Sequence, residues 1–339
     1  MSLTKVSYNL IKGSTGVENV GIGENVFSAL TTGESNTALG FDAAAGITTS
    51  YGNVAIGLGA LSSASQTGDQ NTAVGRFALQ NSTTGYENVA VGTSALGANT
   101  TGNINIAIGR KAGLRNTTGH ENVAIGTNSM GNEASPGVST GDGNTAVGRN
   151  TLEDNTTGAN NTAIGRVALP SNTTGNKNTA LGYFALLNNT TGSDNVAIGA
   201  NALEAATTVG ANVAVGAFAL NAATNERNTA LGNGALLTTT TGTNVIGIGD
   251  AAVASSATAS NEATIGNNNL AEVRAPGIGL SLTRTNIEVQ DGKIVFGSGS
   301  PEGVVTASVG SLFLRVDGGA GTTLYVKEAG TGNTGWAAK

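Results

Sequence analysis

A glycine recurs with a period of about 17 residues through most of this 339-residue chain. Every interval between successive repeat glycines is 16 to 18 residues, except one step of 22 residues between Gly126 and Gly148. A period of this size is typical of stacked repeat architectures, in which each unit packs only on its neighbours. The period therefore predicts a repeat shaft. Its glycines are Gly23, Gly40, Gly57, Gly75, Gly92, Gly109, Gly126, Gly148, Gly165, Gly182, Gly199, Gly216, Gly232, Gly249 and Gly266.

The composition excludes a conventional globular core. Charged residues make up 11% and aromatic residues 4% of the chain, both low for a soluble domain. Apolar residues nevertheless fall at fixed positions of every repeat, which argues against disorder. The formal net charge of −6 argues against a nucleic-acid partner, and the absence of cysteine excludes disulfides and thiolate metal sites. No apolar run reaches the ~18 residues that a membrane span needs.

Each repeat reads Asn, a Thr or branched aliphatic residue, Ala, an aliphatic residue and Gly, as in Asn71–Gly75. Thr, Val and Ile favour extended backbone, and side chains alternate between the faces of a strand. The second half of the repeat reads Ala-Leu and then a polar turn, as in Ala168-Leu169 and Asn172–Gly175. We therefore expect two short strands and two turns per coil. The fold class is all-β, a β-solenoid (β-roll) of about 17 residues per coil, with the asparagines stacked as a ladder.

The two faces of the first strand predict an oligomer. Asn, Ala and Gly share one face and suit a narrow interior, which leaves a stripe of Val, Ile and Leu exposed. Copies of the chain can cover this stripe by packing it around a common axis. The alternative assignment puts the aliphatic residues inside a monomeric coil and Ala and Gly outside. The expected seam consists of Ile56, Val74, Val91, Ile108, Ile125, Val147, Ile164, Leu181, Ile198 and Val215.

The segments outside the repeat divide the chain into four parts. Residues 1–18 form an N-terminal attachment or capping arm, residues 19–266 the repeat shaft, residues 267–300 a connector, and residues 301–339 a C-terminal β-tip. An Asp291-Gly292 turn between alternating runs predicts a β-hairpin in the connector. The insertion that contains Asn132 and Pro136 is expected to form a surface loop.

Repeats such as Asn122-Val-Ala-Ile-Gly126 resemble the head repeats of trimeric autotransporter adhesins. The resemblance covers residues 19–266. It implies a left-handed β-roll and a parallel homotrimer with the aliphatic residues near the trimer axis.

The two ends of the chain resemble a different class of protein. The opening Met1-Ser-Leu-Thr-Lys-Val-Ser-Tyr-Asn-Leu-Ile-Lys-Gly13 is similar to the start of bacteriophage tail fibres and tailspikes. The stretch from Gly310 through Thr323-Leu-Tyr-Val-Lys327 to Trp336 is similar to C-terminal segments of phage fibre proteins. A secreted adhesin would need a signal peptide and a C-terminal barrel anchor. Neither is visible in the sequence, which favours the virion interpretation.

No residue constellation points to catalysis, a cofactor or a metal. The only histidine, His120, lies in a turn, and the carboxylates are scattered over the coils without a distinguishable pair. The Asp142-Gly143 and Asp317-Gly318-Gly319 turns offer oxygen ligands for Ca²⁺, although a plain turn is the preferred interpretation of each. Possible receptor contacts are Tyr325 and Trp336 in the tip, and a basic ridge formed by Arg76, Arg110, Arg149 and Arg166.

The sequence thus predicts a non-enzymatic structural fibre of a phage virion, a tail fibre for host attachment. Its expected partners are two further copies of itself, other virion proteins through the N-terminal arm, and a glycan or protein of the host cell surface. It is expected in the virion, and outside the cell after host lysis, without membrane insertion or nucleic-acid binding. The alternatives are a virion decoration or tail connector protein without a receptor role, and a bacterial surface adhesin.

Overall fold

The computed structural model describes residues 18–131, 138–267, 272–275, 280–283, 286–289, 292–315, 324–330 and 332–339. The chain divides into two compact units, Met1–Thr264 and Ile265–Lys339. Over the described residues, both units consist of strands and turns without helix. The all-β class and the solenoid with a small C-terminal sheet are therefore confirmed. The expectation for the arm 1–18 falls almost wholly outside the described residues.

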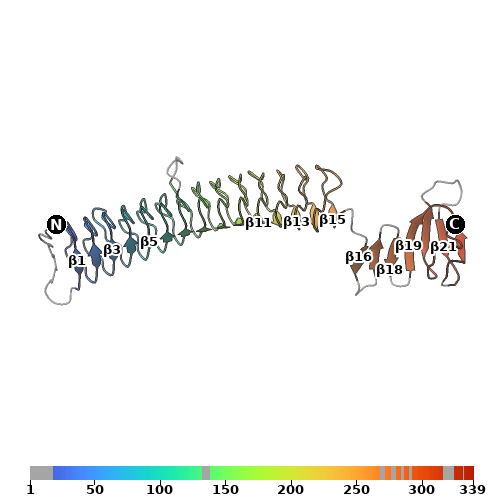
Figure 1. Cartoon of the computed structure of the whole chain (residues 1–339), viewed down its shortest axis with the longest axis horizontal. Helices are drawn as coiled ribbons and strands as arrows, with labels where there is room; N and C mark the ends of the chain where they lie inside the picture. Colours follow the sequence, from blue (N-terminus) through green and yellow to red (C-terminus); the bar gives the residue numbers. More distant parts are fainter. Residues whose placement is uncertain are drawn as a thin grey trace, which may run out of the picture. The chain divides into compact units, whose positions relative to one another are not determined.

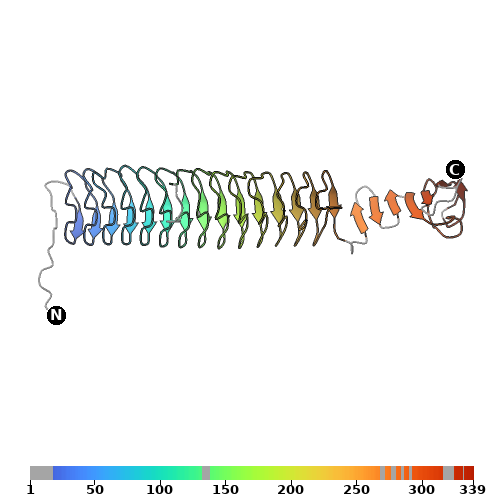
Figure 2. The ribbon, with the colours of Figure 1, turned by 90° about the horizontal axis from the view of Figure 1, so that it is seen from above.

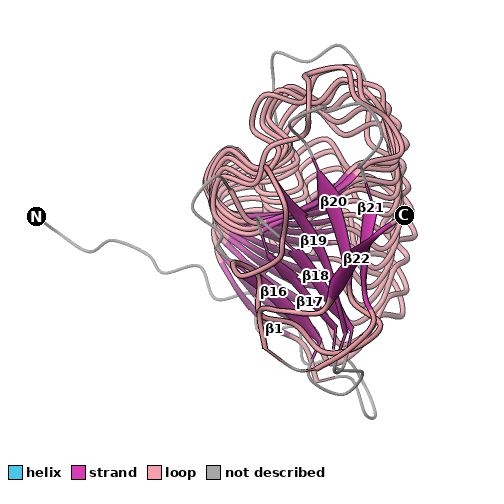
Figure 3. Ribbon diagram, turned by 90° about the vertical axis from the view of Figure 1, so that its right-hand side faces the viewer, coloured by secondary structure: helices cyan, strands magenta, loops and turns pink. Residues whose placement is uncertain are grey.

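The first unit is a single row of stacked coils, each of which contributes one three-residue strand to a 15-stranded sheet. The strands lie side by side along one wall of the coil stack, and the rest of each coil is loop (Figures 1, 2 and 3). They are β1 (Val20–Ile22), β2 (Thr37–Leu39), β3 (Val54–Ile56), β4 (Thr72–Val74), β5 (Val89–Val91), β6 (Ile106–Ile108), β7 (Val123–Ile125), β8 (Thr145–Val147), β9 (Thr162–Ile164), β10 (Thr179–Leu181), β11 (Val196–Ile198), β12 (Val213–Val215), β13 (Thr229–Leu231), β14 (Ile246–Ile248) and β15 (Ala263–Ile265).

The strands pair in parallel, and equivalent repeat positions face one another. Ala90 pairs with Ala107, and Ala107 with Ala124. The register is kept across the 22-residue step as well, because Ala124 pairs with Ala146. The expected surface loop of the insertion includes residues 132–137, which lie outside the described residues. Parallel in-register pairing places identical residues above one another in columns along the solenoid.

The interior is a column of strand alanines packed with a column of leucines from the opposite wall. The alanine of β2 through β13 is buried in every coil, and so are leucines such as Leu96 and Leu169. A Cβ placed on Gly113 would lie close to both Leu96 and the strand residue Ala107. The prediction that Ala faces a narrow interior is confirmed. The alternative, with the aliphatic strand residues inside and Ala outside, is wrong.

A ladder of buried asparagines runs beside the alanine column, as predicted. Oδ1 of Asn71 accepts hydrogen bonds from the backbone N–H of Asn88 at 3.0 Å and from its Nδ2 at 3.1 Å. Nδ2 of Asn88 also donates to the carbonyl of Gly102 at 2.9 Å. Buried polar groups cost free energy unless they are paired, and here each coil supplies the partners of the previous one. The ladder runs through Asn19, Asn36, Asn53, Asn71, Asn88, Asn105, Asn122, Asn144, Asn161, Asn178, Asn195, Asn212 and Asn228.

The second half of each coil is not a strand, so the prediction of two strands per coil is wrong. The leucine of the Ala-Leu pair has left-handed backbone, with φ 50° at Leu79 and at Leu169. Its N–H nevertheless reaches the next coil, since Leu79 N donates to Ala95 O at 3.0 Å. Left-handed backbone costs about 1–2 kcal/mol for an L-residue, and burial of a leucine side chain returns about 1.5–3 kcal/mol. The free energy gained by burying the leucine side chain against the alanine column therefore offsets the cost of its left-handed backbone.

The repeat glycines occupy positions that no other residue fits. Gly109 has φ 135°, and a Cβ on it would lie 2.6 Å from the carbonyl oxygen of Gly126 in the next coil. Both the backbone conformation and the close stacking of coils thus demand glycine at this point. Because this contact recurs once in every coil, the glycines recur with a period of about 17 residues.

The second unit is a seven-stranded sheet in sequence order. Its strands are β16 (Glu272–Ala275), β17 (Leu280–Thr283), β18 (Asn286–Val289), β19 (Gly292–Gly297), β20 (Leu312–Arg315), β21 (Leu324–Lys327) and β22 (Trp336–Ala338). Its neighbouring strands pair antiparallel, except β19 with β20. The predicted hairpin is confirmed, with Ile287 opposite Ile294, although Asp291 of its turn lies outside the described residues. One sheet thus spans the ranges 267–300 and 301–339.

Substitution Gly109→Ala tests the close contact between coils. We expect it to lower the free energy of unfolding by at least about 2 kcal/mol, because a Cβ meets the carbonyl of Gly126 in an unfavourable backbone region. The matched control is Gly234→Ala, since Gly234 has φ 59° and no atom within 4 Å of a built Cβ. Urea unfolding monitored by circular dichroism measures both variants. Equal destabilisation by the two substitutions would contradict the account.

Candidate functional site: the aliphatic face of the solenoid

The outer face of the 15-stranded sheet is uncharged over its whole length and largely apolar. The first and third residues of each strand point outward, and we call these two rows the aliphatic face. None of the strands β1–β15 contains a charged residue. Leu39 is 47% exposed, Ile108 41% and Leu181 43%. A contiguous apolar strip of this kind marks an interaction surface on a soluble protein.

The structure brings all ten predicted seam residues into one row. Each is the third residue of its strand, from Ile56 on β3 to Val215 on β12, and parallel in-register pairing makes the row continuous. With strands ~4.8 Å apart and ~3.3 Å per residue, the fifteen strands present a face of roughly 10 by 70 Å, or about 700 Å². Stable specific interfaces bury about 600–1,000 Å² on each partner, and this face falls within that range. The face is therefore large enough for a specific contact.

The two rows of the aliphatic face differ in polarity. The third residue of every strand is Ile, Val or Leu, whereas six strands begin with threonine. Those threonines are Thr37, Thr72, Thr145, Thr162, Thr179 and Thr229. The row at the third position is thus the more apolar one, and the row at the first position can tolerate partial contact with water.

The predicted basic ridge lies beside this face, directly after the repeat glycines. Arg76, Arg110, Arg149 and Arg166 are all exposed. Two of them lie against aromatic rings: the Arg76 guanidinium is 5.0 Å from the centroid of Phe77, and that of Arg166 is 5.6 Å from the centroid of Tyr183. Cation–π contacts of this kind hold the side chain close to the surface. The arginines are therefore accessible, and two of them are positioned by neighbouring rings.

The two aromatic residues that sequence analysis proposed as receptor contacts are core residues of the second unit. Tyr325 is 9% and Trp336 8% exposed. Both rings meet Phe313 edge to face, with centroids 6.0 and 6.2 Å apart, and Nε1 of Trp336 donates to the carbonyl of Val305 at 3.0 Å. Their side chains pack the tip and present little surface to a receptor.

Two charged residues that sequence analysis did not single out hold the same core together. Lys327 is fully buried, and its Nζ donates to the carbonyls of Gly332, at 2.9 Å, and Thr334. The Glu302 carboxylate accepts hydrogen bonds from the backbone N–H of Trp336 at 2.8 Å and of Gly335 at 3.0 Å. These two bonds lower the pKa of Glu302 from its ordinary value of 4.5. No sequence pattern marks either residue, since their partners are backbone groups.

Several of the turns that precede the strands carry a second set of contacts between coils that sequence analysis missed. The side chain in one coil caps a backbone N–H in the coil before it. His120 Nδ1 accepts from Asn103 N–H at 3.1 Å, and Asp142 Oδ1 accepts from His120 N–H at 2.7 Å. Asp142 therefore serves as a turn cap, and Asp317 of the other candidate Ca²⁺ turn lies outside the described residues. The described part of the chain holds no cluster of acidic, histidine or cysteine residues fit for a metal ion.

Comparisons with protein families, with curated proteins and with solved structures find no match for this chain. Within the part that the structure describes, no helix has the length and apolar character to span a membrane. The geometry of the chain itself therefore carries the functional argument.

A single cysteine on the aliphatic face tests whether copies meet there. The chain contains no cysteine, so Ile164→Cys places one thiol on the third-position row. In a parallel, in-register assembly the same residue of neighbouring copies meets near the axis, and we expect a short bismaleimide to give covalent dimers on a denaturing gel. The control is Thr174→Cys, at an exposed turn residue away from the face. Equal cross-linking at both positions would contradict a seam on this face.

Glu302→Gln tests the carboxylate that fastens the end of the chain. Because the pKa of Glu302 is lowered on folding, its stabilisation is present above its ordinary value of 4.5 and is lost as the pH falls through the folded value. We expect the variant to unfold at a lower urea concentration than the wild type at neutral pH, and at the same concentration in strong acid. Fluorescence of Trp336, the only tryptophan, reports the unfolding of this unit.

The control for this experiment is Glu328→Gln. The Glu328 carboxylate forms a surface ion pair with Lys339, both about half exposed, and such pairs contribute little. A loss at Glu302 that persists unchanged in acid would show that the carboxylate charge plays no part.

Proposed function

We propose that this chain is a structural, non-enzymatic fibre whose three copies pack in parallel with their aliphatic faces toward a common axis. One observation carries the proposal. A single chain already encloses the interior of the solenoid, and yet it leaves an uncharged aliphatic face exposed on the outside. Buried alanines and leucines make up most of the interior, and the asparagine ladder pairs its own side-chain amides between coils, so the strand aliphatics have no role inside the monomer. Their removal from water by neighbouring copies supplies a driving force of about 25 cal/mol per Å² of apolar surface.

The difference between the two rows favours three copies over two. A pair of chains placed face to face buries both rows equally. In a three-fold arrangement one row lies nearer the axis than the other, and each face contacts two neighbours. The all-aliphatic third-position row suits the axis, and the row with six threonines suits the partly solvated rim. The ten seam residues from Ile56 to Val215 then form the central column.

We assign this fibre to a phage virion as a tail fibre that attaches to the host surface. The resemblance of both chain ends to phage fibre proteins supports the assignment, and a rigid solenoid suits a spacer. In this role the N-terminal arm joins other virion proteins and the distal part meets a glycan or protein of the host. Three identical chains display each surface site three times, which raises avidity without new contacts. The fibre leaves the cell with the particles after lysis.

Labelling of particles tests the assignment to a virion. Antibodies raised against the solenoid, residues 19–266, are applied to phage particles from an induced or infected culture of the organism that encodes the chain, and gold label is located by electron microscopy. We expect label on tail appendages. Label on the capsid would instead indicate a decoration fibre, and label on the bacterial surface alone would indicate an adhesin. Either result would overturn the tail-fibre proposal.

A further inference from the structure

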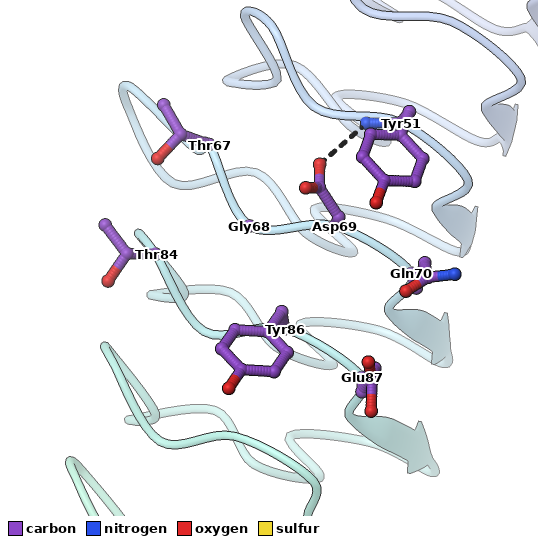
Figure 4. Close-up of a pocket in the computed structure, with 8 residues that line it drawn as sticks. All are labelled: Tyr51, Thr67, Gly68, Asp69, Gln70, Thr84, Tyr86 and Glu87. Carbon is purple, nitrogen blue, oxygen red and sulfur yellow. Dashed lines mark hydrogen bonds between the residues drawn. The ribbon is translucent and has the colours of Figure 1, made fainter.

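Two exposed tyrosines flank a shallow open pocket on the N-terminal part of the solenoid. Tyr51 is 47% and Tyr86 42% exposed, and both occupy the turn just before a strand. They lie two coils apart, about 10 Å at the usual strand spacing, and Asp69 occupies the same turn of the coil between them. The pocket has a volume of about 210 Å³ and is also lined by Gln70 and Glu87 (Figure 4).

The turns that form this pocket are fixed by hydrogen bonds between coils. Oδ1 of Asp69 accepts from Tyr51 N–H at 2.9 Å, and Gln70 N–H donates to the carbonyl of Tyr51 at 3.0 Å. Glu87 N–H in turn donates to the carbonyl of Asp69 at 3.0 Å. The backbone of all three turns is thus held in place before any ligand arrives. A site that is ordered in advance loses less entropy on binding.

The tyrosines are a local departure from the repeat. The same turn position holds Asn176, Ser193 and Ala159 in later coils, and Asn176 and Ser193 there cap the preceding coil as Asp69 does. Stacking of the coils therefore requires no aromatic ring at this position. An exposed ring that the fold does not use is a candidate for contact with a ligand, because Tyr offers an apolar face and a polar hydroxyl together.

The chemistry of the lining selects one class of ligand. Aromatic faces pack against the C–H faces of sugar rings, and carboxylate and amide groups accept or donate hydrogen bonds to their hydroxyls. Asp69 and Glu87 contribute two carboxylates and Gln70 an amide, and no lysine or arginine is among the pocket's lining residues. The local charge is negative, which repels an anionic glycan.

We propose that Tyr51, Asp69 and Tyr86 form a binding site for an uncharged saccharide, with one sugar ring against each tyrosine and Asp69 bonded to hydroxyls between them. This proposal adds a ligand class and a binding position on the solenoid to the proposed role in host attachment. The biological use of the site rests on that proposed function. Three copies of the chain would carry three such sites and bind a polysaccharide multivalently.

The experiment uses the purified full chain and an array of printed bacterial glycans, both neutral and anionic, followed by titration calorimetry with the best neutral oligosaccharide. Tyr51→Ala and Tyr86→Ala are each expected to weaken binding about tenfold or more, as the loss of a central aromatic contact does. Asp69→Asn keeps an oxygen for Tyr51 N–H and is expected to weaken binding without unfolding the chain. The matched control is Phe218→Ala, which removes a similarly exposed ring elsewhere on the solenoid and leaves binding unchanged.

Several outcomes would overturn this inference. They are the absence of binding to every neutral glycan, binding that survives both tyrosine substitutions, and binding restricted to anionic glycans. Circular dichroism of each variant establishes that the solenoid is folded before binding is measured. A negative result in the glycan-binding experiment would not contradict the fibre proposal, because that proposal is tested separately by the location of the chain on phage particles.

Discussion

The structure depends on one constraint: each coil of about 17 residues must hydrogen bond to the next along its whole circumference. A coil this short encloses too little space for two layers of large side chains. The strand therefore turns only alanine inward, opposite leucine, and asparagine closes the corner by bonding to its equivalent in the neighbouring coil. The repeat glycine lets the backbones approach where a Cβ would meet a carbonyl. Interior composition, period and ladder all follow from this single requirement.

The same constraint places the aliphatic strand residues outside. Because side chains alternate along a strand, an inward alanine fixes an outward residue on each side of it. Polar residues would fit this outward position as well, yet the third position is Ile, Val or Leu in all fifteen strands. This pattern supports the proposal that the face is one side of an interface between copies of the chain in a trimeric fibre.

The sequence predicts features that repeat and misses features that depend on local tertiary contact. The alternation Thr-Ala-Val at 72–74, which recurs in most coils, predicts that Ala and the aliphatic residues lie on opposite faces of the strand, but it leaves open which face is inside. The sequence predicts a strand for the Ala-Leu half because nothing in it marks Leu79 for the left-handed backbone that the structure shows. The left-handed conformation results from burial of the leucine side chain against the alanine column. This contact becomes apparent only when the coils are stacked.

Single-copy features were the hardest to predict. The sequence suggests Trp336 and Tyr325 as possible receptor contacts, but in the structure both side chains pack a sheet whose order depends on long-range pairing. Likewise, nothing in the sequence distinguishes Asp69 from the other carboxylates scattered over the coils. Only the stacking of coils places it between Tyr51 and Tyr86 and bonds it to a backbone N–H.

The central claim is that the aliphatic face exists to be covered by further copies of the chain, and the solution mass tests it most directly. Light scattering on the purified chain, coupled to size-exclusion chromatography, measures that mass independently of shape. The account predicts three times the 33.2 kDa of one chain. A stable, soluble species of 33.2 kDa would contradict it, because the aliphatic face would then remain in water.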